Sequence, residues 1–161
     1  MKKILIISVI TFIIDLISKL LVESNLELYK SLSIIDNFFY LTYTHNYGAA
    51  FSILKHNKLL LIIVGIIAII SVLIYIKKQP KIKQIEIISY GLLIGGIVGN
   101  LYDRIIYGYV RDFLDFYIFG YDFAIFNLAD SAIVIAIILL MIDTILGGVK
   151  NEDNNSWRYG R

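Results

Sequence analysis

The stretch Val110-Arg111-Asp112-Phe113 is followed, after an aromatic segment, by Phe126-Asn127-Leu128-Ala129-Asp130-Ser131 and then by an apolar run long enough to cross a bilayer. An aspartate therefore stands on either side of a segment that adjoins a hydrophobic span. Carboxylates beside such spans are costly, and they often mark a functional site. We interpret the rest of the chain as a frame that holds Asp112 and Asp130 near each other at the membrane surface.

The composition is that of a membrane protein. Of the 161 residues, 58% are hydrophobic and 17% are charged, whereas soluble domains are roughly half apolar and about a quarter charged. The length fits one domain, residues 1–161. The net charge of +2 is small and the lysines gather in short loops, so we expect no nucleic-acid partner.

Cysteine is absent, which excludes disulfides, thiolate catalysis and Cys-ligated metals. His45 and His56 are the only histidines, and two are too few for a convincing His-based metal site. We therefore predict neither a metal nor another cofactor.

Four apolar segments are predicted to be transmembrane helices. They are residues 4–22, 58–76, 85–106 and 128–147. The first has the basic start and apolar centre of a signal peptide, but no small-x-small cleavage site follows it and it contains Asp15 and Lys19, so we expect it to be retained. Residues 150–161 are expected to form a mobile polar tail.

The basic residues predict the orientation of the spans. Most lie near the two termini and in the turn 77–83, whereas Lys30, Lys55 and Arg111 lie in the other loops. The positive-inside rule then places both termini in the cytoplasm and the ends of spans three and four that face residues 107–126 at the outer surface. Asp112 and Asp130 are thereby brought to the same membrane level.

The two outer segments favour short strands. Residues 37–44 are rich in aromatic and β-branched side chains, and residues 113–126 favour a short hairpin or a helical turn at the interface. In Asn46-Tyr47-Gly48-Ala49-Ala50-Phe51, the small residues permit close backbone approach, although a turn that closes a hairpin explains the spacing equally well. The fold class is a mainly α membrane protein, with four transmembrane helices and a small extracytoplasmic β-sheet.

Several residues inside the spans are polar or small. Asp15 and Lys19 are four apart and share a helical face, and an ion pair that orients the first helix is favoured over a direct chemical role. Lys19 could also extend its amine to the outer interface. Gly91, Gly95 and Gly99 recur every four residues, which predicts close packing of the third span against a neighbouring helix.

The outer end of the third span carries Asn100, Asp103 and Arg104 within one turn. Asn100 and Arg104 share a face. Arg104 could reach the interface, or it could hold a carboxylate by a charge-assisted hydrogen bond. Asn127 precedes Asp130 by three residues and is expected on the same helical face.

Two aspartates at one membrane level can form an aspartic protease pair. Like charges at short range cannot easily both ionise, so one pKa rises. A helix N-terminus favours ionised Asp130, which leaves Asp112 as the proton holder, although a coupled pair titrates as a unit. Helix capping and interfacial solvation explain Asp130 at least as well on spacing alone.

A non-enzymatic alternative is a membrane carrier or proton-coupled binding protein that uses Asp15, Lys19, Asp112 and Asp130. Carrier sites tend to lie near the bilayer midplane, often on broken helices. In this chain the acids gather at the outer edge, and no proline interrupts a span.

Five motifs together resemble the lipoprotein signal peptidase family, also called signal peptidase II. They are Asp15-Leu16-Ile17-Ser18-Lys19, Asn46-Tyr47-Gly48-Ala49-Ala50-Phe51, Gly95-Gly96-Ile97-Val98-Gly99-Asn100-Leu101-Tyr102-Asp103-Arg104, Val110-Arg111-Asp112-Phe113 and Phe126-Asn127-Leu128-Ala129-Asp130-Ser131. Each motif is weak alone, but five in this order at the outer ends of spans are specific.

The resemblance implies a bacterial cytoplasmic or inner membrane enzyme that cleaves the signal peptide from diacylglyceryl-modified prolipoproteins, just before the lipidated cysteine. It implies metal-free aspartic catalysis by Asp112 and Asp130. It also implies substrate-binding or site-supporting roles for Asp15, Lys19, Asn46, Gly48, Asn100, Arg104 and Asn127. Membrane lipid is the other expected partner, a mobile outer segment is expected over the site, and we expect a monomer.

Two positions depart from the family pattern. Ser18 stands where the family often has threonine, and both residues carry a hydroxyl. Arg111 stands where an apolar residue is frequent, and it could tune Asp112 or point to lipid headgroups.

Overall fold

The computed structural model describes residues 1–48 and 57–156, and this part of the chain forms four helices and four strands. The helices are α1 Lys2–Asn25, α2 Lys58–Lys78, α3 Gln84–Ile106 and α4 Leu128–Ser156. Each is long and apolar enough to cross a membrane, which confirms the four predicted spans. The predictions made for Ala49, Ala50 and Phe51 fall outside the described residues.

The helix ends differ from those predicted. α1 continues to Asn25, and α4 continues to Ser156, so most of the segment predicted to be a mobile polar tail is helical. Each added residue contributes one backbone hydrogen bond, and no proline stops the extension. The change from apolar to polar residues therefore predicts where the apolar span of α4 ends, but not where the helix ends.

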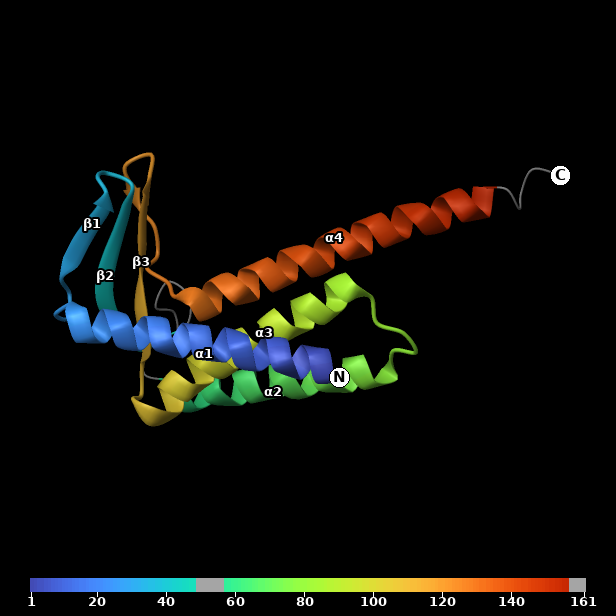
Figure 1. The fold of residues 1–161 in the computed structure, drawn as a ribbon, viewed down its shortest axis with the longest axis horizontal. Helices are drawn as coiled ribbons and strands as arrows, with labels where there is room; N and C mark the ends of the chain where they lie inside the picture. Colours follow the sequence, from blue (N-terminus) through green and yellow to red (C-terminus); the bar gives the residue numbers. More distant parts are fainter. Residues whose placement is uncertain (49–56, 157–161) are drawn as a thin grey trace.

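Helix α3 is the centre of the bundle, because it contacts α1, α2 and α4. The start of α1, the end of α4 and the α2–α3 connection lie at one end of the helices, and the strands lie at the other (Figure 1). We call these the terminal end and the sheet end. α4 diverges from the other helices toward the terminal end (Figure 1).

The glycine stripe of α3 permits its close contact with α1. A Cβ atom on Gly95 would lie 2.6 Å from the backbone oxygen of Ser8, and one on Gly99 would lie 2.5 Å from Oδ2 of Asp15. These spacings leave no room for a larger residue. The predicted close packing is confirmed, and it brings Asp15 directly against α3.

The strands form one antiparallel sheet at the sheet end, in the order β1-β2-β3-β4. They are β1 Ser31–Ile35, β2 Phe39–Asn46, β3 Val110–Ile118 and β4 Tyr121–Asp122. The strand prediction for residues 37–44 is confirmed by β2, whereas β1 was missed. Residues 113–126 contain a hairpin that turns at Phe119 and Gly120, both with positive φ, so the helical-turn alternative is wrong.

The pairing of β2 with β3 aligns two predicted site residues. Asn46 is opposite Val110, and Thr44 is opposite Asp112. Asn46 therefore ends a strand that pairs with β3, and the interpretation of Asn46 and Gly48 as a hairpin turn is wrong. The turn between β1 and β2 lies earlier, at residues 36–38.

Candidate active site

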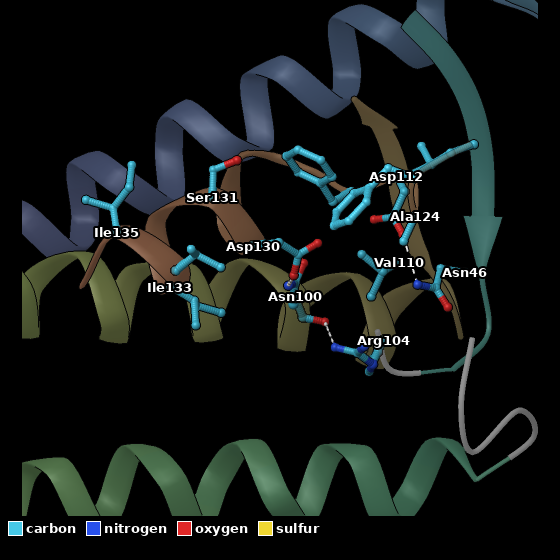
Figure 2. A pocket seen from close by; sticks show the side chains of 14 residues that line it. Asn46, Asn100, Arg104, Val110, Asp112, Ala124, Asp130, Ser131, Ile133 and Ile135 are labelled. Carbon is cyan, nitrogen blue, oxygen red and sulfur yellow. Dashed lines mark hydrogen bonds between the residues drawn. The ribbon is translucent and has the colours of Figure 1, made fainter. Parts of the chain in front are cut away.

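A cavity of about 650 Å³ opens where β3, α3 and the start of α4 meet (Figure 2). Its polar lining residues are Asn46, Asn100, Arg104, Asp112, Asp130 and Ser131. The other lining residues are apolar: Val110, Phe123, Ala124, Ile125, Phe126, Ile133, Val134 and Ile135. Two carboxylates thus face a largely apolar cavity of the size that holds small ligands.

Asp112 is supplied by β3 and is held by two amides. Asn46 Nδ2 donates a hydrogen bond to its Oδ2 at 2.9 Å, and Asn127 Nδ2 donates to its Oδ1 at 2.6 Å. The residue is only 2% exposed. Burial, followed by the charge of Asp130, raises the pKa of Asp112 to about 7. Asp112 can therefore carry a proton near neutral pH.

Asp130 lies in the first turn of α4 and takes part in the helix cap. Its backbone N–H donates to Asn127 Oδ1 at 2.9 Å, and the Asn127 N–H donates back to Asp130 Oδ2 at 3.3 Å, the reciprocal pattern of a capping box. Asn100 Nδ2 donates to the other carboxylate oxygen at 2.7 Å. Asp130 therefore caps the helix and also lines the cavity, although the sequence analysis treated capping and a catalytic role as alternatives.

Asn127 links the two aspartates. Its amide nitrogen donates to Asp112 Oδ1 and, at 3.1 Å, to Asn100 Oδ1, while its amide oxygen accepts from the Asp130 backbone. The side chain is fully buried. The prediction that Asn127 lies on the helical face of Asp130 is wrong, because Asn127 precedes α4. From this position its side chain binds the Asp112 carboxylate and its backbone N–H binds the Asp130 carboxylate.

The ion pair predicted between Asp15 and Lys19 is confirmed, with 2.7 Å between Lys19 Nζ and Asp15 Oδ2. The same amine lies 3.3 Å from Asp103 Oδ2 and 3.2 Å from Asn100 Oδ1. Lys19 is buried among these acceptors, so the interfacial alternative is wrong. Asp15 Oδ1 also accepts from the backbone N–H of Ala129 at 2.9 Å, which fixes α1 to the start of α4.

Arg104 and Gly48 meet at the rim of the cavity. Arg104 Nη2 donates to the Gly48 carbonyl at 3.0 Å, and Nη1 donates to the Asn100 carbonyl at 3.4 Å. These hydrogen bonds go to carbonyl oxygens, and the alternative in which Arg104 donates to a carboxylate is not found among the described side chains. The Gly48 N–H donates to Asn46 Oδ1 at 2.9 Å and thereby orients the amide that binds Asp112.

Arg111 and Glu23 were not among the predicted site residues. Arg111 is fully buried and binds Asp103 at 2.7 Å and Glu23 at 2.7 Å, so the alternative that it faces lipid headgroups is wrong. A signal for Glu23 was present, since it follows Lys19 by four residues on the same face of α1. The role of Glu23 depends on its ion pair with Arg111 of β3, and sequence spacing cannot predict that contact.

The arrangement suits acid–base chemistry on a bound water. Among the described side chains, no group of three or more His, Asp or Glu residues could hold a metal ion. The chemically active groups in the cavity are two carboxylates in different hydrogen-bonding environments. Such a difference separates the proton affinities of an acid and a base.

Comparisons with known proteins agree with this geometry. The family model described as signal peptidase (SPase) II matches residues 7–146. A lipoprotein signal peptidase of Alteromonas mediterranea is 39% identical over 153 residues, which cover 92% of this chain and 84% of that protein.

Two solved structures of bacterial membrane enzymes are similar throughout. One has a TM-score of 0.85 at 33% identity and covers 94% of this chain and 92% of its own. The other has a TM-score of 0.81 at 33% identity, with 89% and 93% covered. Nothing in these comparisons supports the carrier alternative. The chain is a multi-pass membrane peptidase and belongs to the signal peptidase II family.

Proposed function

We propose that this member of the signal peptidase II family is an aspartic endopeptidase. It removes the signal peptide from diacylglyceryl-modified prolipoproteins by cutting just before the lipidated cysteine, and Asp112 and Asp130 are its catalytic pair. One observation carries the proposal: two carboxylates, the buried Asp112 of β3 and the half-buried Asp130 of α4, line one cavity and both accept hydrogen bonds from Asn127. The named function of the relative from Alteromonas mediterranea supports the substrate class.

The lining of the cavity supports a lipid-bearing substrate. The apolar residues Ile133, Val134 and Ile135 continue from Asp130 along α4 (Figure 2). An acyl chain or apolar signal-peptide residue that covers them loses contact with water, which favours binding. The carboxylates at one side of this surface then meet the peptide backbone where it leaves the apolar environment.

The two aspartates divide the acid and base roles. Asp112 holds the proton, since its pKa is raised to about 7. Asp130 is the base, because the helix N-terminus and the amide of Asn100 stabilise its ionised form. Asp130 takes a proton from water, the water oxygen attacks the scissile carbonyl carbon, and Asp112 protonates the leaving nitrogen. Return of the proton from Asp130 to Asp112 restores the resting pair.

Asparagine, arginine and lysine side chains support this pair. Asn46 and Asn127 hold Asp112, while Asn100 holds Asp130. Among the described residues that line the cavity, Arg104 is the only lysine or arginine, and we assign it to the substrate backbone or to developing negative charge. Lys19 and Asp15 orient Asn100 and the start of α4.

The topology that we propose puts the site at the extracytoplasmic surface and both termini in the cytoplasm. Its support is the segregation of the start of α1, the end of α4 and the lysine-rich α2–α3 connection from the sheet end (Figure 1). One domain, residues 1–161, and one copy of the chain suffice, because this chain itself supplies both aspartates and their amide partners. Membrane lipid is the only further partner required.

The test is cleavage of a purified diacylglyceryl-modified prolipoprotein, in detergent or bilayers and in the presence of EDTA. We expect the native enzyme to cut before the lipidated cysteine, and Asp112→Asn and Asp130→Asn to reduce kcat by ~10²–10⁴-fold, the usual loss on removing an acid or base. The matched control is Asp36→Asn, which makes the same chemical change at an exposed turn of the sheet.

Three results would contradict the proposal. Near-native rates in both cavity variants would exclude the aspartate pair. Loss of cleavage in EDTA, restored by added metal, would exclude a metal-free mechanism. A cut at any other bond would exclude the proposed specificity.

A further inference from the structure

Arg111 is a charged side chain that the proposed reaction does not use. It directly precedes Asp112 in β3 and is fully buried. A buried guanidinium is costly unless its charge and donors are matched. In this protein the match is made by Asp103, by Glu23 and by the ring of Tyr107, whose centroid lies 4.5 Å from the guanidinium carbon.

These contacts join three elements. Arg111 Nη2 and Nε donate to the two carboxylate oxygens of Asp103 in α3, at 2.7 and 3.2 Å, and Nη1 donates to Glu23 in α1 at 2.7 Å. Asp103 Oδ2 also accepts the backbone N–H of Arg111 at 3.0 Å. The start of β3 is therefore fixed to α3 through main chain and side chain at the position just before Asp112.

Arg111 does not itself line the cavity. Successive side chains of a strand point to opposite faces, and it is Val110 and Asp112 that face the cavity. Any effect of Arg111 on the reaction must therefore pass through the groups to which it is attached. One path is the backbone, from Asp103 through the Arg111 N–H to the next residue, Asp112.

A second path leads to Asp130. Asp103 shares its Oδ2 with Lys19, and Lys19 donates to the amide oxygen of Asn100. The amide nitrogen of Asn100 then binds Asp130 at 2.7 Å. Without Arg111, the whole charge of Asp103 would attract Lys19 away from Asn100.

We propose that Arg111, held between Glu23 and Asp103, is a positioning residue that sets the placement of Asp112 relative to Asp130. This inference rests on the proposed catalytic pair. Glu23 completes the arrangement, because its second oxygen accepts from the Tyr43 hydroxyl of β2 at 3.2 Å and so ties the sheet to α1. The positions of both aspartates thus depend on one guanidinium.

The test uses Glu23→Gln, Arg111→Lys and Arg111→Met in the full-length enzyme. Glu23 is 37% exposed, and glutamine keeps a carbonyl oxygen for Arg111, so this variant should fold with a native unfolding temperature. We expect kcat to fall about tenfold in Glu23→Gln and ~10²-fold in Arg111→Met, with KM unchanged, since small displacements of reacting groups cost this much. Arg111→Lys keeps the charge without the two-pronged contact and should have an intermediate kcat.

The matched control is Asp143→Asn, which removes a carboxylate from the Lys83 salt bridge at the terminal end, where the distance is 2.8 Å. It should retain native kcat. Native kcat in folded Glu23→Gln and Arg111→Lys would overturn the inference. So would losses that follow the folded fraction, or that appear in KM alone. If Asp112→Asn remains active in the same assay, it is the proposed catalytic pair that fails, which is a separate result.

Discussion

The two ends of the helix bundle each carry a lysine–aspartate ion pair of nearly the same length. At the sheet end, Lys19 lies 2.7 Å from Asp15, and both side chains are at most 1% exposed. At the terminal end, Lys83 lies 2.8 Å from Asp143, with side chains 56% and 18% exposed. Their surroundings differ far more than their distances do.

That difference decides what each pair can do. Lys19 also binds Asp103 and Asn100, so its charge is part of a network that reaches Asp130. Water and salt ions are replaced there by fixed protein groups, which makes every partner necessary. Lys83 is largely exposed, so water can take over the role of Asp143 as its partner. Burial, rather than the length of the ion pair, therefore distinguishes the network beside the cavity from a surface contact.

Breaking the buried pair should have the largest effect. Lys19→Met keeps most of the side-chain volume and leaves Asp15 and Asp103 without their shared cation. Loss of one partner from a buried pair costs about 3–5 kcal/mol of stability. We expect a loss of this size in the free energy of unfolding in detergent, together with loss of prolipoprotein cleavage. A Lys19→Met enzyme with native stability would show that water already reaches this pair.

Asp112 extends the comparison to a buried carboxylate held mainly by amides. Its pKa of about 7 in the folded enzyme lies above the ordinary value of 3.8. Below pH ~4 the group is protonated in both states, and between about 4 and 7 only the unfolded chain releases the proton. The free energy of unfolding should therefore fall as pH rises through this window, by roughly 2–4 kcal/mol.

Asp112→Asn should remove this dependence while it abolishes cleavage, so that the inactive variant is the more stable one above pH 7. The native enzyme should also lose kcat/KM above pH ~7, because the acid has then lost its proton. Chemical denaturation and cleavage, each measured from pH 4 to 9, check both expectations. An unchanged stability profile in Asp112→Asn would show that Asp112 is not the proton holder.

The sequence was sufficient to predict the four helices and several of the residues that line the cavity. Long apolar runs specify spans whatever surrounds them, and the motifs that contain Asp112, Asp130, Asn46 and Asn100 stand where the structure forms one cavity. The prediction of the spans depended on local composition, and that of the site residues depended on the order of the spans and on the resemblance of five motifs to a family. Composition, order and motifs are all contained in the sequence itself.

The contacts within the site could not be predicted in the same way. Arg111 was assigned to Asp112 or to lipid because the fold had not yet brought β3 against Asp103 and Glu23. For Arg104, the interface and a carboxylate were open alternatives, and the structure pairs it instead with the Gly48 carbonyl, just after β2. The partners of these buried charges lie on other helices or strands, whereas sequence spacing predicts only contacts between residues within one or two helical turns.

A substitution at Gly99 of α3 would disturb the buried Asp15–Lys19 pair without changing either charged residue. A Cβ at this position would lie 2.5 Å from Asp15 Oδ2, so Gly99→Ala should push the carboxylate away from Lys19. Overpacking of this kind costs about 1–3 kcal/mol. Gly65→Ala is the matched control, because its Cβ would meet only the movable side chain of Leu101, at 2.8 Å. Equal losses in thermal stability would mean that Asp15 does not depend on the space at Gly99.

The exposed pair should give the smallest effect. In Asp143→Asn, Lys83 keeps its hydration, and we expect the unfolding temperature and kcat to remain native. Added salt should weaken what little this pair contributes, whereas the buried network should be insensitive to salt because ions cannot enter it. Stability and cleavage measured at low and high ionic strength separate the two cases. A loss of kcat in Asp143→Asn comparable to that in Lys19→Met would show that α4 transmits changes from the terminal end to Asp130, and the two ends could then no longer be treated as independent.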